Sequence, residues 1–171
     1  PNYFTEDLMD TVASLPKVMP HIEVPIQAGD DEVLKNMRRG YTQQDYRGLV
    51  KKIRVRIPDC SIATDIIVGF PGETDAQFME TYRVLADLRL DVAHLARYSS
   101  REGTVATRTM TDDVTDEEKM RRFRLLEELQ EGIVGEINQK YLGQKVEVRL
   151  EEKVTGRWRG RTPTNKLVFV E

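Results

Sequence analysis

From Thr64 to Thr74 the chain reads TDIIVGFPGET, an apolar run that ends in a glycine-rich break. The residues from Ser61 to Val68 are crowded with β-branched side chains, which predicts a buried strand. Pro71 and its flanking glycines stop that strand, and Thr74 with Gln77 gives the capping-box pattern that begins a helix. A glycine-rich turn that opens onto a helix N-terminus can present backbone N–H groups to an anionic or polar ligand.

Two interpretations of this turn stay open at the level of sequence. A tight connection between a strand and a helix uses the same glycines without binding anything. Asp65 favours a binding site, because a carboxylate inside an apolar strand requires a polar partner or a ligand. We therefore expect Asp65 and the turn to contribute to a ligand site.

Two further stretches read as strands, Ile22 to Ile26 and Val92 to Arg97. Strands that alternate with helical stretches indicate βα units and a parallel sheet. Three strands are too few for a closed barrel, which needs about eight, so we expect either a small open sheet or part of a larger one. Ligands of parallel α/β sheets bind beyond the carboxyl ends of the strands. Those ends are 27–29, 69–73 and 98–101, and we expect them to share one site.

The remainder of the chain changes character twice. Residues 102–114 read as a polar loop, and Thr115 with Glu118 predicts a long helix that runs to about Tyr141. After it, the alternation from Val146 to Leu150 predicts a half-buried strand. The segment 153–170 then holds five cations and no acid, with two aromatic residues between them. Such a pattern suits RNA, and a solvated hairpin is the alternative.

The composition limits the classes of protein. The 171 residues suffice for one domain, or for one domain and a piece of another, and 26 basic against 29 acidic side chains give a net charge of −3. This balance argues against a general polyanion binder. Cys60 is the only cysteine, which excludes a disulfide or a multi-cysteine metal site within the chain and favours a structural thiol. Without a signal peptide or a long apolar run, we expect a cytoplasmic location.

Four blocks of sequence, taken together and in order, resemble a known family. They are IEVPIQAG at 22–29, TDIIVGFPGET at 64–74, YSSREGT at 98–104 and GRTPTNK at 160–166. The chain is similar to the radical S-adenosylmethionine methylthiotransferases from His21 onward. Within them it is most similar to the tRNA 2-methylthio-N6-isopentenyladenosine synthase family, which modifies the adenosine beside the anticodon.

The resemblance implies an α/β fold in which residues 1–142 form the C-terminal part of a radical-enzyme (β/α) barrel of parallel strands. Residues 143–171 would be a truncated small β-barrel, the RNA-binding TRAM domain. The family uses S-adenosylmethionine and two 4Fe-4S clusters, one of which cleaves S-adenosylmethionine to a radical that abstracts hydrogen from adenine. It also requires a sulfur donor and an electron donor. The cluster cysteines would lie outside this chain, so we expect no metal ligand and no catalytic residue here, and no activity from this fragment alone.

The family motifs assign two groups of residues. The first would contact S-adenosylmethionine: Gln27, Asp65, Gly69, Pro71, Gly72, Glu73, Tyr98, Ser99 and Arg101. The second would contact tRNA: Lys153, Arg157, Trp158, Arg159, Arg161, Asn165 and Lys166. The chain departs from the family where Gln27-Ala28-Gly29-Asp30 replaces the usual Gln-Ser-Gly-Ser, which removes two hydroxyl groups.

Other functions remain open. A related methylthiotransferase would act on another modified adenosine or on a ribosomal-protein aspartate. A non-catalytic RNA-binding module would bind tRNA with a steep salt dependence and ignore S-adenosylmethionine. A barrel enzyme for a phosphorylated metabolite is disfavoured by Asp65 and Glu73, because carboxylates repel phosphate. Bare strand edges also predict that the fragment dimerises.

Overall fold

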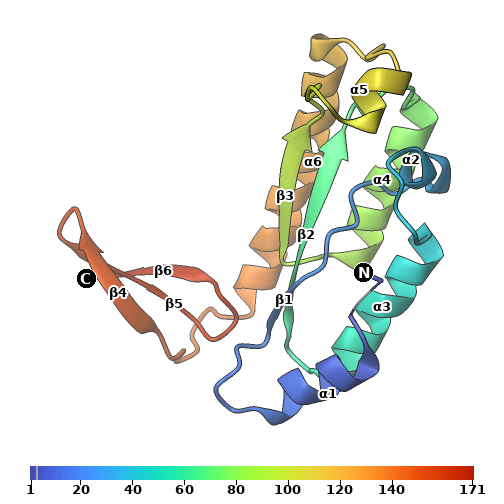
Figure 1. Ribbon diagram of the computed structural model, residues 1–171. Coiled ribbons are helices and arrows are strands. Elements are labelled where there is room, and N and C mark those ends of the chain that lie inside the picture. The colour runs from blue at the N-terminus through green and yellow to red at the C-terminus, as the bar shows by residue number, and fades with distance from the viewer. Residues whose placement is uncertain (3) are drawn as a thin grey trace.

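The computed structural model describes residues 1–2 and 4–171, and these form two separate three-stranded sheets (Figure 1). The larger part holds the first sheet and its helices, and the second sheet projects from its lower end. In chain order the elements are α1 (Glu6–Ser14), β1 (His21–Glu23), α2 (Asp31–Asn36), α3 (Gln43–Arg56), β2 (Ser61–Val68), α4 (Asp75–Leu88), β3 (Val92–Arg97), α5 (Val105–Thr109), α6 (Asp116–Gln139), β4 (Arg149–Val154), β5 (Arg157–Arg161) and β6 (Leu167–Val170).

The first sheet is parallel throughout and has the order β1-β2-β3. The expected βα units are therefore confirmed, with β2 at the centre. The strand predicted from Ile22 to Ile26 is shorter, because β1 pairs only through Glu23 and then departs from the ladder. Gln27 returns to the sheet in an isolated parallel bridge with Ile66. The carboxyl ends of all three chain segments therefore lie at the same end of the sheet.

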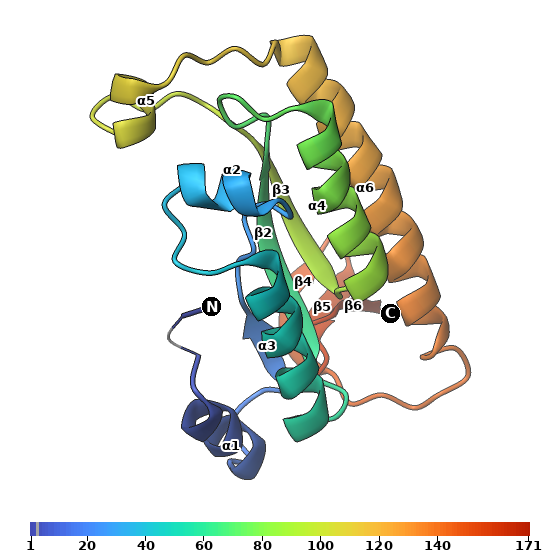
Figure 2. The same cartoon turned by 90° about the vertical axis from the view of Figure 1, so that its right-hand side faces the viewer.

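Helices α3, α4 and α6 lie on one side of this sheet (Figure 2). Alternate side chains of β2, such as Ile66 and Val68, point into the core that these helices cover and are fully buried. Asp65 and Ile67 point to the opposite side and are only partly buried. The main core gathers residues of both layers, among them Ile22, Tyr46, Ile53, Ile62, Phe78, Leu85, Leu126 and Ile133.

The helix starts follow the predicted caps with one difference. Thr74 and Gln77 form a reciprocal capping box at α4, as predicted. At α6 the Thr115 hydroxyl accepts from the Glu118 N–H, but the Glu118 carboxylate does not return the bond. That carboxylate instead pairs with arginines one turn further along the helix, because an ion pair binds it more strongly than a backbone N–H does.

A second, smaller core fixes the ends of the strands. It contains Ala28, Val33, Leu34 and Phe70, with Tyr98 and other partly buried side chains packed against it. Polar residues 102–114, predicted as a loop, contain the short helix α5, whose Ala106 packs on this cluster. The sequence analysis missed α5 because five residues are too few to show a helical period.

The second sheet is antiparallel and has the order β4-β5-β6. The strand predicted from Val146 to Leu150 is displaced toward the C-terminus, because β4 begins only at Arg149. Gly160 of β5 permits a close approach, since a Cβ there would lie 2.5 Å from the Arg149 carbonyl oxygen. Within the described residues, no helix combines the length and the apolarity that a membrane crossing requires.

Candidate functional site

A cavity of about 360 Å³ lies where β2 and β3 end, beside the segment that follows α2. Ile67 and Phe70 contribute apolar surface, and Tyr98, Ser99 and Arg101 extend from the end of β3. Tyr98 meets Phe70 edge to face, with 5.2 Å between the ring centroids. The mixture of an apolar lining with a few polar groups, at this volume, is typical of a small-molecule site. The structure therefore brings together the expected ligand groups of the third strand.

Gln27 contributes to this end of the sheet in a different way. Its side chain is mostly buried, and its Oε1 accepts a hydrogen bond of 3.1 Å from Nη2 of Arg39, which lines the cavity. The backbone of Gln27 has a left-handed φ of 74° and bonds on both sides to β2, through the Asp65 carbonyl and the Ile67 N–H. Gln27 therefore positions Arg39 at the cavity and does not itself line it.

Both glycine N–H groups of the turn are already bonded within the chain, whereas the sequence predicted that they would be free. The Gly69 N–H donates to Oε2 of Glu73 at 2.7 Å, and the Gly72 N–H donates to Oδ1 of Asp113, also at 2.7 Å. The Glu73 N–H donates to the Phe70 carbonyl at 2.9 Å. Carboxylates of the chain itself thus occupy the donors that an anionic ligand would use.

Glu73 joins the turn to the long helix. Its side chain is buried, and Oε2 accepts from Nη1 of Arg122 at 2.8 Å. Burial raises the pKa of the Glu73 carboxyl, while the Gly69 N–H and the Arg122 guanidinium act in the opposite direction. Glu73 therefore holds the turn in place, and like Gly69, Pro71 and Gly72 it does not line the cavity.

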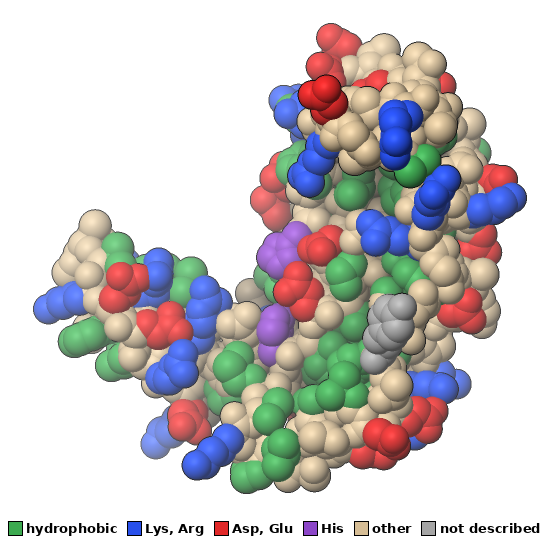
Figure 3. All heavy atoms as spheres, viewed as in Figure 1, with side chains coloured by type: hydrophobic (Ala, Val, Ile, Leu, Met, Phe, Trp, Pro, Cys, Tyr) green, Lys and Arg blue, Asp and Glu red, His purple; other side chains and the backbone are tan. Residues whose placement is uncertain are grey.

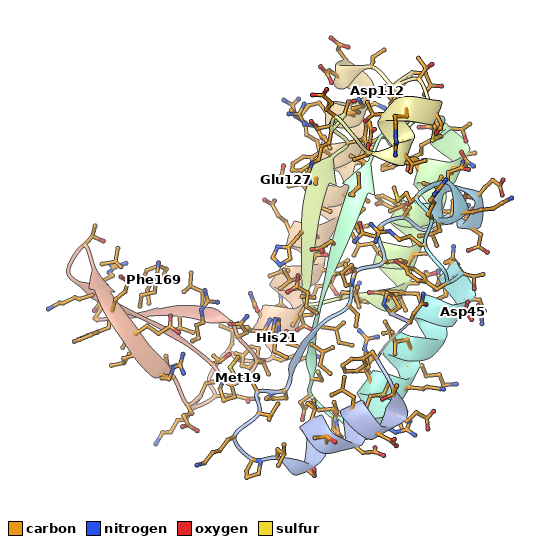
Figure 4. The ribbon with its side chains drawn as sticks, viewed as in Figure 1. Met19, His21, Asp45, Asp112, Glu127 and Phe169 are labelled. Atoms are coloured by element: carbon orange, nitrogen blue, oxygen red, sulfur yellow. The ribbon has the colours of Figure 1, made fainter. Side chains whose placement is uncertain are left out.

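Lys119 of α6 is a residue of this site that sequence reasoning missed. Its side chain is almost fully buried, and its Nζ bonds both carboxylate oxygens of Asp112 at 2.7 Å. Figure 4 shows Asp112 at the upper end of the molecule, close to α5. The same Nζ lies 5.5 Å from the centroid of the Tyr98 ring, a cation–π distance. A lysine in a charged helix carries no sequence signal of this role, because its partners are distant in the chain.

Asp65 lies lower on the uncovered side of the sheet, away from the cavity lining. It is the cross-strand neighbour of His94, and Glu23 of β1 completes a group whose potential ligand atoms lie within 4.8 Å of one another. The expectation that Asp65 needs polar neighbours is thus met by two side chains, and Glu23 carried no signal in the sequence. Carboxylates and imidazole are cation ligands as well as hydrogen-bond partners.

Cys60 does not suit an iron–sulfur cluster. It is half-buried just before β2, and burial raises the pKa of its thiol to about 11. Cluster ligation uses several cysteine thiolates, whereas this chain has a single cysteine that is held in the thiol form. The residues of this chain therefore do not fit a 4Fe-4S cluster.

The cations of the second sheet are largely paired with acids. Arg161 lies 3.6 Å from Glu151, and Lys166 lies 3.5 Å from Asp91. Arg159 pairs with Glu152 on the neighbouring strand. Figure 3 accordingly shows basic and acidic side chains intermixed on this sheet. Two other members of the predicted RNA-binding set also have partners: Arg157 pairs with Glu171 at 3.6 Å, and Asn165 accepts a hydrogen bond from Arg161. The last two are accessible to solvent, since Trp158 is 41% exposed and Lys153 is exposed.

Comparison with protein families gives the class to which this fold belongs. Residues 1–85 match the model described as the Radical SAM superfamily. A structure of coproporphyrinogen III oxidase from Escherichia coli, described as a radical SAM enzyme, aligns with 80% of this chain and 31% of its own length. The TM-score is 0.55 at 19% identity, so this likeness concerns the fold alone. The parallel sheet is that of a radical SAM protein.

Curated relatives match the chain from end to end. Proteins named tRNA-2-methylthio-N(6)-dimethylallyladenosine synthase are 52% identical in Roseiflexus sp. and 50% identical in Herpetosiphon aurantiacus. These alignments cover 99% and 100% of this chain, and 36% and 40% of the relatives. The relative from Dehalococcoides mccartyi is 46% identical, over 100% of this chain and 41% of its own length. Over its whole length the chain is similar to these methylthiotransferases, and it spans about two fifths of the length of the curated relatives it matches.

Proposed function

We propose that this chain is part of an enzyme that adds a methylthio group to the 2-position of N6-isopentenyladenosine in tRNA. The observation that carries the proposal is the identity of 46 to 52% to relatives of that name across 99 to 100% of the chain. Identity at this level covers the strands, the glycine-rich turn and the cavity at the strand ends. The proposed location of the enzyme is the cytoplasm, where tRNA is modified.

The cavity is the proposed binding site for the nucleoside end of S-adenosylmethionine. Ile67, Phe70 and Tyr98 offer an apolar surface for a base, and Ser99 and Arg101 offer polar contacts. The turn from Gly69 to Glu73 supports these residues, and Gln27 does so through Arg39. In this proposal Asp65 contributes from the open side of the sheet, below the cavity.

Two 4Fe-4S clusters belong to the proposed complete enzyme, with ligands outside this chain. A cluster of this class supplies the electron that cleaves S-adenosylmethionine. The residues described here would bind and orient the cofactor, and none of them is proposed as a catalytic residue. A sulfur donor and an electron donor complete the proposed partners.

The proposed domains are 1–142, a barrel part that contains the first sheet, and 143–171, a TRAM-like part that contains the second sheet. The strands β4, β5 and β6 support the second assignment because antiparallel strands build small β-barrels. In the described chain, β1 and β3 are edge strands, and the side of the sheet that carries Asp65 has no helix over it. We therefore propose that the isolated chain self-associates, and a sedimentation coefficient independent of concentration would contradict this.

The modified nucleosides of tRNA test the proposed function. In a strain that lacks the gene for this protein, mass spectrometry should find N6-isopentenyladenosine in place of its 2-methylthio derivative. Restoring the gene should restore the derivative. Undiminished 2-methylthio-N6-isopentenyladenosine in the deletion strain would exclude this activity and favour another methylthiotransferase substrate.

A further inference from the structure

Four arginines surround the cavity at the strand ends, and we call them the arginine rim: Arg38, Arg39, Arg97 and Arg101. Arg38 and Arg39 follow α2, Arg97 ends β3, and Arg101 lies in the loop before α5. All four are exposed. Among the described residues that line this cavity, there is no Asp or Glu. This concentration of positive charge stands out in a chain whose net charge is −3.

The charges of the rim are not neutralised within the described part of the chain. Arg38, Arg97 and Arg101 have no carboxylate within ion-pair distance there, and Arg39 donates only to the neutral amide of Gln27. Three acids at this end of the chain's first sheet bond to other groups. Asp112 pairs with Lys119, Asp113 accepts from the Gly72 N–H, and Glu73 pairs with Arg122. Glu102, next to Arg101 in the chain, is exposed.

The second sheet, which the sequence singled out for RNA, shows the opposite arrangement. Four of the five cations in the segment 153–170 pair with an acid: Arg157, Arg159, Arg161 and Lys166. An arginine already paired with a carboxylate must give up that contact before it can pair with a phosphate, so its contribution to RNA binding is reduced. The rim differs from this sheet because its four arginines have no such ion pair among the described residues. Figure 3 shows Lys and Arg side chains at the upper end of the molecule, with acidic side chains among them.

The proposed cofactor does not account for this charge. S-adenosylmethionine carries a sulfonium, an ammonium and one carboxylate, so its net charge is positive. A carboxylate requires one arginine, and the remaining guanidinium groups would repel the cofactor. A polyanion at the same place removes this repulsion. Phosphate is the anion that a planar guanidinium pairs with in bidentate geometry.

We propose that the arginine rim is where the phosphodiester backbone of the substrate RNA docks, at the mouth of the cofactor cavity. The inference rests on the proposed tRNA-modifying function and adds the surface that holds the RNA. Contacts to phosphates position a nucleic acid without reading its sequence. The rim would therefore hold the RNA strand beside the cavity, while the second sheet contributes exposed Trp158 and Lys153 at a distance.

The test is the salt dependence of tRNA binding by the complete protein. The affinity for unfractionated tRNA is measured over a series of salt concentrations for the wild type, for the double variant R38Q/R97Q and for the matched control R157Q/R159Q. Each lost phosphate contact lowers the slope of log K against log salt by about 0.7 to 0.9. R38Q/R97Q should therefore lower the slope by about 1.5 and weaken binding at least about tenfold at low salt. The control should change the slope by less than half as much.

A charge-preserving variant separates electrostatics from misfolding. R38K/R97K should recover most of the slope if the positive charge is what binds the RNA. Only variants whose thermal unfolding midpoint equals that of the wild type are compared. A slope that falls in R157Q/R159Q and stays at the wild-type value in R38Q/R97Q would overturn the rim while leaving the proposed function in place. A wild-type protein that binds no tRNA would overturn both.

Discussion

Glu73 and Arg122 form a buried ion pair, with 2.8 Å between Oε2 and Nη1, that joins the turn after β2 to α6. The same guanidinium donates to the Glu73 carbonyl at 3.0 Å, and its Nε bonds Glu118. The turn that ends the central strand β2 is therefore held by α6, a helix that begins more than 40 residues later in the chain. This explains how a glycine-rich segment keeps one conformation beneath the cavity.

Removal of Arg122 should be costly. In Arg122→Met the Glu73 carboxylate stays buried without its partner, and breaking a buried pair in this way costs about 3 to 5 kcal/mol. Urea unfolding measures the loss of stability. Arg124→Met is the matched control, because Arg124 is exposed on the same helix and should change stability by less than about 0.5 kcal/mol. Equal effects of the two substitutions would show that the pair does not stabilise the turn.

Alanine at two glycines of the turn separates backbone strain from packing. Gly69 and Gly72 both have left-handed φ values, 72° and 80°, which cost a residue with a Cβ about 1 to 2 kcal/mol. A Cβ at Gly69 would also collide with Cγ of Lys119, whereas one at Gly72 meets open space. Thermal unfolding should therefore show a larger loss for Gly69→Ala than for Gly72→Ala. The reverse order would mean that Lys119 does not pack over the turn.

The acid stability of the protein should depend on Glu118. Hydrogen bonds from Arg121, and then from Arg122, lower the pKa of this carboxyl from 4.5 to about 2. Because the folded state lowers this pKa, the carboxylate stabilises the protein at a pH above 4.5, and that contribution is lost as the pH falls from 4.5 toward 2. Unfolding measured across this range should show a shallower acid loss for Glu118→Gln. Glu117→Gln, one residue away and exposed, should keep the wild-type pH dependence.

Local sequence patterns predicted the arrangement of strands and helices, but they did not predict which partners the polar groups bond to. The strand 92–97 and the cap at Thr74 were predictable because residue spacing and capping are local properties. The donors of the glycine-rich turn were predicted to be free, yet Asp113 reaches the Gly72 N–H from 41 residues away. Partners at such distances in the chain leave no periodic signal.

The ion pairs of the second sheet were also hidden in the sequence. A segment without acids read as a basic surface, but antiparallel pairing places Arg159 beside Glu152 of the preceding strand. The arginine rim is the reverse case. Its members come from three separate segments, and only the parallel register brings Arg97 to the level of the turn after β2. Charge patterns therefore needed the fold before they indicated a surface.

The central claim is that the cavity at the strand ends is the cofactor site of a methylthiotransferase. Ala96→Phe fills the cavity from an exposed position on β3, and Val55→Phe, at a position 71% exposed on α3, is its control. Each variant of the full-length enzyme is returned to the deletion strain, and the ratio of 2-methylthio-N6-isopentenyladenosine to N6-isopentenyladenosine in tRNA is measured by mass spectrometry. The account predicts at least about a tenfold lower ratio for Ala96→Phe at equal protein levels, the loss expected when a misplaced contact disturbs a bound cofactor, and a wild-type ratio for Val55→Phe. A wild-type ratio for Ala96→Phe would contradict it.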